Sequence, residues 1–229
     1  MAGITTAFPT SAKAEYFQAA HCFNATVTPT ASGTSGQFTL TSMSSNAGVA
    51  VGMSASGTNV ASGAVVASID SSTQITLSKA HTGTVGPTAT ITISGDTFKM
   101  ALFKSGVAGT YGAATVNYTD MTGNSDETSG TGYSATGTAL TNVTAVTSGT
   151  TGYINFSPNP SWTSSSFSTD GCMIYNTNAR LGGTSGTNTQ GAGRCVGVFS
   201  FGSTVTVSSG TLTVLMPAAA AGTAVIRIG

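Results

Sequence analysis

The stretch "ISGDTFKMALFKSG", residues 93–106, decides the fold class of this chain. After a Ser-Gly-Asp turn signal, Phe98, Met100 and Leu102 share one face, and Lys99 begins the other. A period of two residues is the pattern of a β-strand. We therefore expect a strand here whose Lys99 side faces solvent, or where Lys99 blocks a sheet edge or touches an interface.

Strand-like patterns continue over most of the chain. Short runs rich in Val, Ile and Thr are separated by Gly, Ser and Asn, as in "QFTLTSM", "GAVVASID", "TQITLS", "TATITIS", "GCMIYNT", "GRCVGVFSFG", "TLTVLMP" and "TAVIRIG". The segments "CMIY" and "CVGVF" are continuously apolar, which is typical of strands covered on both faces. Many short strands with frequent turns predict an all-β sandwich.

One segment has a helical pattern instead. In "SAKAEYFQAAHCF", residues 11–23, the side chains of Tyr16, Ala20 and Phe23 follow the i, i+4, i+7 spacing of one helix face. His21 lies beside this stripe, with no acidic residue or second histidine at ligand spacing. We interpret His21 as a packed or surface histidine.

Residues 24–95 consist of short Val-, Ile- and Thr-rich strand patterns with few charges, unlike the helix before them and the more apolar strands after them, and this change predicts two domains. The host domain would comprise residues 1–23 plus 96–229, an antiparallel β-sandwich of jelly-roll or immunoglobulin-like type with one short N-terminal helix at about 11–23. Residues 24–95 would form a small inserted β module. Such an insertion is tolerated where its two ends lie close together.

Charge is scarce and balanced. Seven acidic and seven basic residues make up 6% of the 229 residues, whereas about 25% is typical. The absence of a basic stripe argues against direct binding of nucleic acid or an anionic membrane. No apolar run approaches the roughly 18 residues of a membrane span, and no secretory signal is predicted. A neutral chain of this kind suits a component of an assembly better than a free enzyme.

Enzymatic motifs are absent from the sequence. It contains no nucleophile elbow, no phosphate-binding loop and no carboxylate pair on matched strands. The segment "DMTGNSDE", Asp120 to Glu127, departs from the spacing of a calcium loop, and we interpret it as a solvated turn. We therefore predict no catalytic residues, no cofactor and no metal site.

Three cysteines, Cys22, Cys172 and Cys195, lack metal-ligand spacing. They are interpreted as small buried residues, with a Cys172–Cys195 cross-strand disulfide as the alternative, although a reducing compartment disfavours it. The long glycine-rich loop within residues 178–194 is expected to be exposed.

The segment "MAGITTAFPTS" precedes the predicted helix and is polar and proline-containing. It could form a subunit-contact arm through Ile4, Phe8 and Pro9. Such an arm would order on a neighbouring subunit.

Several pieces of the sequence resemble a family of tailed-bacteriophage virion proteins, which are small all-β structural proteins. They are "TSAKAEYFQAAHCF", "GDTFKMALFKSGVAG", "SGTGYSATGTALTNV", "INFSPNPSWTSSSFSTDGCMIYNT", "RCVGVFSFG" and "GTLTVLMPAAAAGTAVIRI". In the commoner pattern of that family, the helix is followed almost directly by the "DTFK-ALY" strand. Here residues 24–95 intervene, and "VGMSASGTNVASGAVVASIDSSTQITLS" resembles a small β module of phage structural proteins.

The resemblance implies a non-enzymatic virion structural protein, made in the host cytoplasm. The expected post is capsid decoration or cement, binding the major capsid protein or other virion proteins and self-associating as a trimer or dimer. The alternatives are a tail, neck or fibre component, or a module that binds host-surface glycans. For glycan binding, residues 24–95 offer Phe38 as their one aromatic residue.

Overall fold

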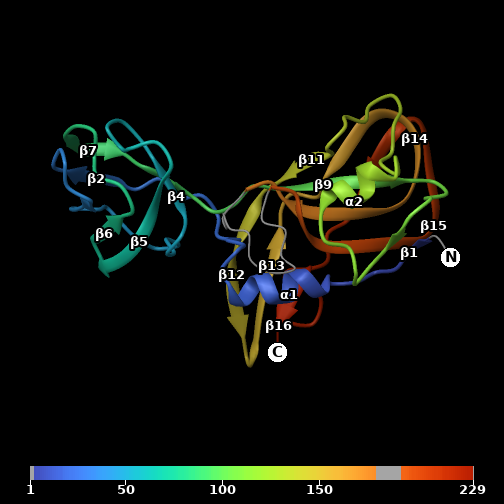
Figure 1. The fold of residues 1–229 in the computed structure, drawn as a ribbon, viewed down its shortest axis with the longest axis horizontal. Helices are drawn as coiled ribbons and strands as arrows, with labels where there is room; N and C mark the ends of the chain where they lie inside the picture. The colour runs from blue at the N-terminus through green and yellow to red at the C-terminus, as the bar shows by residue number, and fades with distance from the viewer. Residues whose placement is uncertain (1–2, 179–191, 229) are drawn as a thin grey trace. The chain divides into compact units, whose positions relative to one another are not determined.

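The computed structural model describes residues 3–178 and 192–228. Within these ranges the chain is mostly β-strand, and helix is confined to two short segments (Figure 1). The predicted all-β class with antiparallel sheets is therefore confirmed. Most of the loop that was expected to be exposed, residues 179–191, lies outside the described ranges.

The chain divides into two compact units. Unit 1 comprises Met1–His21, Thr97–Thr141 and Val146–Gly229, and unit 2 comprises Cys22–Asp96 and Asn142–Ala145. The predicted insert, residues 24–95, falls within unit 2, whose strands run from blue through teal to green in Figure 1.

Two hydrogen bonds join the ends of the long unit 2 segment. The Cys22 N–H donates to Asp96 Oδ2 at 2.9 Å, and the Asp96 N–H donates to the Cys22 carbonyl at 2.8 Å. The chain therefore enters and leaves unit 2 at adjacent positions.

Among the described residues, unit 1 contains two helices and eight strands that lie wholly within it. Their bounds are β1 (Gly3–Ile4), α1 (Thr10–Phe17), β9 (Phe98–Lys104), β10 (Thr110–Tyr111), α2 (Tyr118–Gly123), β11 (Thr138–Leu140), β13 (Thr151–Phe156), β14 (Ser161–Asn176), β15 (Arg194–Thr213) and β16 (Ile226–Ile228). A further strand, β12 (Asn142–Ser148), begins in unit 2 and ends in unit 1.

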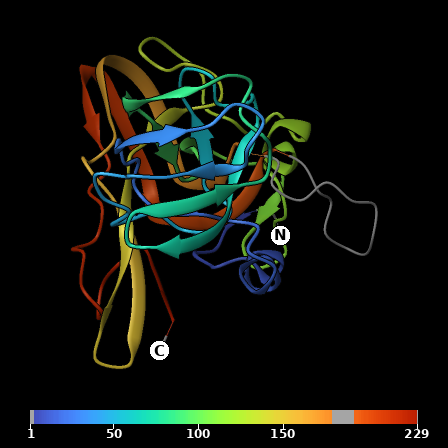
Figure 2. The same cartoon turned by 90° about the vertical axis from the view of Figure 1, so that its left-hand side faces the viewer.

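The main sheet of unit 1 has the strand order β11-β9-β14-β15. The long strands β14 and β15 pair antiparallel from Ser161 opposite Thr213 to Asn176 opposite Arg194. Four register shifts interrupt this ladder. Bulges bend a strand and increase its twist, which accounts for the curvature of the orange-to-red strands in Figure 2.

Strand β9 is covered on both faces. Ala101 and Phe103 on the Lys99 face have 0% exposure, because they pack in a cluster with Tyr111 of β10 and Met121 of α2. The prediction that the Lys99 face of this strand is exposed to solvent is therefore wrong for Ala101 and Phe103. Residues of α2 and β10 pack over this face, and the alternating pattern does not reveal them.

The other face of β9 packs toward a second sheet, whose strand order is β12-β13-β16. The rings of Phe98 on β9 and Phe156 on β13 lie 5.4 Å apart. Ile154 and Ile226 of the second sheet are also buried. Two packed sheets with apolar side chains between them form the sandwich-like core of unit 1.

The predicted helix at residues 11–23 is too long. Helix α1 covers Thr10–Phe17, and the chain leaves helical geometry at Ala19, whose φ is +53°. The buried helix residues are Ala12 and Glu15, so the predicted apolar stripe does not exist. The reason is a buried polar cluster around Glu15, described below, that turns the chain back after the helix.

Helix α2 was not predicted. Asp120 Oδ2 accepts hydrogen bonds from the Val116 N–H at 2.7 Å and the Asn117 N–H at 3.1 Å. These donors precede the helix, and the Asn-x-x-Asp spacing from Asn117 resembles a capping box. This signal was present in the sequence.

Unit 2 is built of short strands around its own core. Its strands are β2 (Thr30–Gly33), β3 (Thr39–Leu40), β4 (Ser54–Ser56), β5 (Ala64–Ser71), β6 (Gln74–Leu77), β7 (Val85–Thr90) and β8 (Thr92–Ser94). They form a five-stranded sheet, β3-β6-β5-β4-β8, and a pair, β2-β7. Ile75 and Leu77, two residues apart on β6, are both buried in the core of this unit, as the strand period requires.

We predict that unit 1 folds without unit 2. Replacing residues 24–95 by a short Gly-Ser linker keeps the Cys22 and Asp96 pair, so the two ends are already adjacent. Trp162, the only tryptophan of the chain, is buried in unit 1 and reports on its fold. A native-like emission spectrum and one cooperative urea transition are expected. An aggregate or an exposed Trp162 would show that unit 1 needs the insert.

We also predict that Gly137→Ala strongly destabilises unit 1. Gly137 has a φ of +70°, and a Cβ there would lie 1.9 Å from the Met100 carbonyl oxygen. Gly149→Ala is the matched control, because its φ is +58° but no atom lies within 4 Å of its Cβ position. In urea denaturation followed at Trp162, we expect losses of roughly 3 kcal/mol and about 1 kcal/mol, respectively. Equal losses would refute a steric role for Gly137.

Candidate interaction surface

Asp126 is a structural carboxylate in unit 1. It is fully buried and accepts hydrogen bonds from the N–H groups of Ala108 (2.9 and 3.0 Å) and Gly109 (2.7 Å). The Tyr111 hydroxyl donates to it at 2.7 Å, and Lys104 Nζ lies 3.0 Å from Oδ1. These donors hold the loop after β9 against the sheet.

The same donors shift the titration of this site. Burial by itself raises the pKa of Asp126, but the surrounding hydrogen bonds outweigh it and lower the pKa to about 2. Burial, followed by the hydrogen bond to Asp126, raises the pKa of Tyr111 to about 12. Both groups therefore keep a fixed protonation state near neutral pH, which is unsuited to proton transfer.

Glu127 is surrounded by tyrosines. Its carboxylate accepts hydrogen bonds from the hydroxyls of Tyr118 and Tyr133, the latter at 2.7 Å, and from the Thr136 N–H at 2.8 Å. The rings of Tyr118 and Tyr175 stack with centroids 4.5 Å apart. Burial, then the charge of Glu127, raises the pKa of Tyr175 to about 12. This cluster fastens the segment after α2 to the main sheet.

The "DMTGNSDE" segment is therefore not the solvated turn predicted from its sequence. Asp120 caps α2, Asp126 is buried, and Glu127 binds tyrosine hydroxyls. Residues 3–178 and 192–228 contain no group of three or more His, Cys, Asp or Glu side chains placed to hold a metal ion.

His21 has an acidic partner that spacing did not reveal. Because the chain turns after α1, His21 Nε2 reaches Glu15 Oε2 at 2.6 Å, and Arg194 Nε lies 3.7 Å from the same oxygen. The Asn178 N–H donates to Asn176 Oδ1, which orients the Asn176 amide so that Nδ2 donates to His21 Nδ1 at 3.0 Å.

This network fixes the tautomer of a neutral His21 ring. With Nδ1 accepting from Asn176, the proton of a neutral His21 lies on Nε2 and is donated to Glu15. The His21 side chain has 0% exposure. Both ring nitrogens are engaged, so His21 joins α1 to the ends of β14 and β15 and has no free nitrogen for catalysis.

The three cysteines are free and buried, as first interpreted, and the alternative Cys172–Cys195 disulfide does not form. Cys172 lies opposite Phe199 and Cys195 lies opposite Tyr175 on the β14–β15 ladder, so the two thiols are not cross-strand partners. Burial raises the pKa of the Cys172 thiol to about 12, which makes it unreactive.

Residues of the predicted subunit-contact arm pack on unit 1 of their own chain, and their contact with a neighbouring subunit stays a prediction. Ile4 belongs to β1, which pairs in parallel with β10 and places Ile4 opposite Tyr111. The Phe8 ring meets Tyr16 edge-on at 5.2 Å, and Pro9 is buried. The segment is held by unit 1 because β10 offers it a free strand edge.

Unit 1 has an apolar groove of about 200 Å³. One wall is the main sheet and the other is the segment after β15. The lining residues are Met100, Cys172, Ile174, Phe199, Phe201, Val214, Leu215, Met216, Pro217 and Val225. No charged residue lines it, and Leu215 at its rim is 76% exposed. We call this feature the Leu215 groove.

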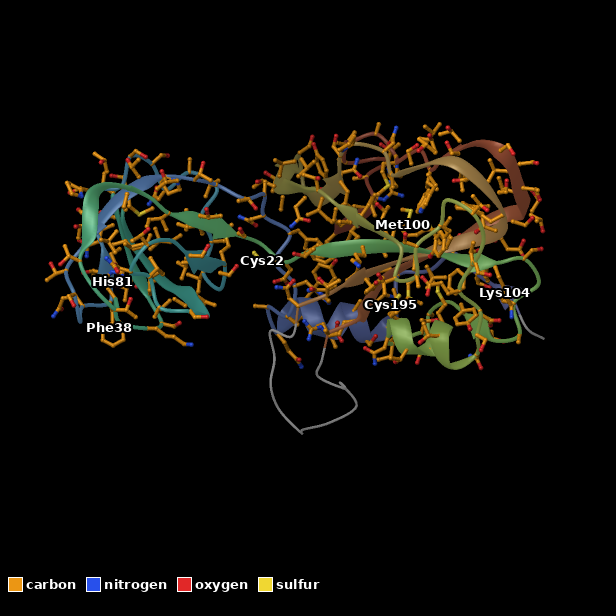
Figure 3. The ribbon with its side chains drawn as sticks, turned by 90° about the horizontal axis from the view of Figure 1, so that it is seen from above. Cys22, Phe38, His81, Met100, Lys104 and Cys195 are labelled. Carbon is orange, nitrogen blue, oxygen red and sulfur yellow. The ribbon has the colours of Figure 1, made fainter. Side chains whose placement is uncertain are left out.

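Isolated apolar side chains also lie outside the groove. Phe17 at the end of α1 is 94% exposed, which is unusual for a large aromatic residue. Phe38 is 48% exposed and lies at the surface of unit 2, whereas Met100 and Cys195 lie within unit 1 (Figure 3). A single phenyl ring on unit 2 is a poor platform for stacking on sugars.

No protein-family model, no characterised protein and no solved structure matches this chain. In the described ranges, no helix has the length and apolar character needed to cross a membrane.

We predict an acid-dependent contribution of Asp126 to stability. Its folded pKa of about 2 lies below the ordinary 3.8, so the stabilisation is complete above about pH 5 and is lost as the pH falls toward 2. Asp126→Asn should lower the free energy of unfolding by roughly 1 to 2 kcal/mol at pH 7. This figure allows for solvent screening of the ion pair, because Lys104 is partly exposed. Urea titrations at Trp162 should show this difference closing with acid. Asp70→Asn is the control, because Asp70 lies in unit 2 and its replacement should not change the unit 1 transition seen at Trp162. A difference in stability between wild type and Asp126→Asn that does not change with pH would contradict the prediction.

Proposed function

We propose that this chain is a non-enzymatic virion structural protein of a tailed bacteriophage, acting in capsid decoration or cement. It would bind the outer shell, bridge the major capsid protein or its neighbours, and associate with copies of itself. The virion is then its site of action, after synthesis in the host cytoplasm. The sequence resemblance to phage virion proteins points in this direction.

The described polar groups support a structural role. Asp126, Glu127 and the pair Glu15–His21 are engaged in holding loops and a helix to the sheet. Catalysis needs a group that can change its protonation state or attack a substrate. Carboxylates used as internal fasteners are poor candidates for that task.

The observation that carries the proposal is the Leu215 groove. An apolar groove without charged lining, bordered by a leucine that is 76% exposed, is a feature of surfaces that bind other proteins. The chain carries no net charge, so many copies can lie side by side without mutual repulsion.

The number of copies of this chain per purified particle tests where in the virion it acts. We expect hundreds of copies per particle when the phage whose genome encodes this chain is purified and its proteins are counted by quantitative mass spectrometry. A handful of copies would favour the tail, neck or fibre instead. Absence from the particle would overturn the proposal.

The groove makes a sharper prediction about binding. Leu215→Asp places a charge where the partner would bury a leucine, which is worth about 1.5 to 3 kcal/mol. Co-sedimentation with shells lacking the protein should therefore show at least tenfold weaker binding. Val51→Asp is the matched control, since Val51 is 61% exposed but lies in unit 2, outside the groove. Equal binding by both variants would refute a role for the groove.

A further inference from the structure

A second concavity of unit 1, of about 240 Å³, is polar rather than apolar. Residues from the N-terminal segment, the loop after β9 and both long strands surround it. The lining includes Ile4, Val107, Asp170, Ser200, Ser203 and Thr204. Aliphatic, hydroxyl and carboxylate groups therefore face one space.

The carboxylate of Asp170 is held in position. Thr204 Oγ1 donates to Asp170 Oδ1 at 2.6 Å, and the Gly106 N–H donates to Asp170 Oδ2 at 2.8 Å. A carboxylate offers about four acceptor positions. Each oxygen therefore retains capacity for one further donor, and the group does not need to reorient to receive it.

No cation of the described chain neutralises this charge. Asp170 makes no salt bridge with any residue of 3–178 or 192–228. Lys104 lies opposite Thr169, the neighbour of Asp170 on β14. However, its Nζ is taken by Asp126 at 3.0 Å and by the Ser125 carbonyl at 2.8 Å. The half-buried Asp170 carboxylate is thus held in position without a salt bridge to any residue of the described ranges.

The lining selects among ligand classes. A calcium ion takes six to eight oxygen ligands, usually with several carboxylates, but Asp170 is the only carboxylate here. A sugar would favour an aromatic wall, and none of the lining residues is aromatic. A guanidinium carries five N–H donors and no acceptor, which matches a carboxylate flanked by hydroxyls. The aliphatic stem of an arginine can pack on Ile4 and Val107.

We propose that this pocket binds an arginine side chain of a neighbouring protein, with the guanidinium paired to Asp170. The site goes beyond the proposed function. Only the statement that the neighbouring protein is a component of the virion rests on the proposed function. Bidentate pairing of arginine with a carboxylate gives geometric specificity as well as affinity.

The test uses the full chain and N-acetyl-arginine methylamide, titrated by NMR chemical-shift perturbation. We expect saturable binding at millimolar concentration, with shifts at residues that line the pocket. Asp170→Asn should weaken binding at least tenfold. Asp70→Asn should leave it unchanged, although Asp70 likewise accepts hydroxyls, from Ser68 at 2.6 Å and Thr76 at 2.7 Å.

A second variant keeps the test decisive if Asp170→Asn fails to fold. Ser203→Arg places the chain's own guanidinium in the pocket and should block the probe, while Trp162 fluorescence stays native. The proposal is overturned if wild-type protein shows no saturable shifts. It is also overturned if Ser203→Arg still binds the probe, or if calcium chloride or glucose gives the same shifts. Because the probe is a small molecule, failure here is distinct from failure to join a particle.

Discussion

The pairing of β14 with β15 is the constraint on which unit 1 depends. These strands, Ser161–Asn176 and Arg194–Thr213, bring distant parts of the chain into one ladder, and β9 extends it on the other side. On one face, their apolar residues Met173, Tyr175, Cys195 and Val198 pack in the cluster that contains Met121 of α2. On the other face, their residues line the Leu215 groove. The polar fasteners also reach this ladder, since Arg194 begins β15 and Asn176 ends β14. Movement of the ladder would therefore disturb the core and the N-terminal helix together.

Several of the few charged residues of this chain make contacts inside it. Glu15 lies between His21 and Arg194, Asp126 holds a loop, and Glu127 collects tyrosine hydroxyls. A buried charge is costly unless it is paired and hydrogen-bonded, and these are. Lys13, Asp70, Lys79 and Arg227 remain as exposed charged residues among the described ones.

The sequence predicted what depends on local pattern and missed what depends on distant partners. The alternation of Phe98, Met100 and Leu102 correctly identified a strand, and short Val- and Thr-rich runs correctly indicated an all-β fold. The end of α1 was placed too late, because Glu15 and Arg194 meet only through the tertiary fold. The burial of Asp126 and the two concavities were likewise invisible, since each joins segments far apart in the chain. The start of α2, by contrast, had a readable capping signal at Asn117 and Asp120.

The hydrogen-bonded pair of Cys22 and Asp96 has a consequence for how such a chain can change over time. Because the two ends of the inserted segment lie next to each other, the segment can be exchanged for another of unrelated sequence and length. Strand register elsewhere need not change. Recombination between genes could therefore swap this portion as a cassette, and a laboratory could use the same position to graft an antigen or an affinity tag.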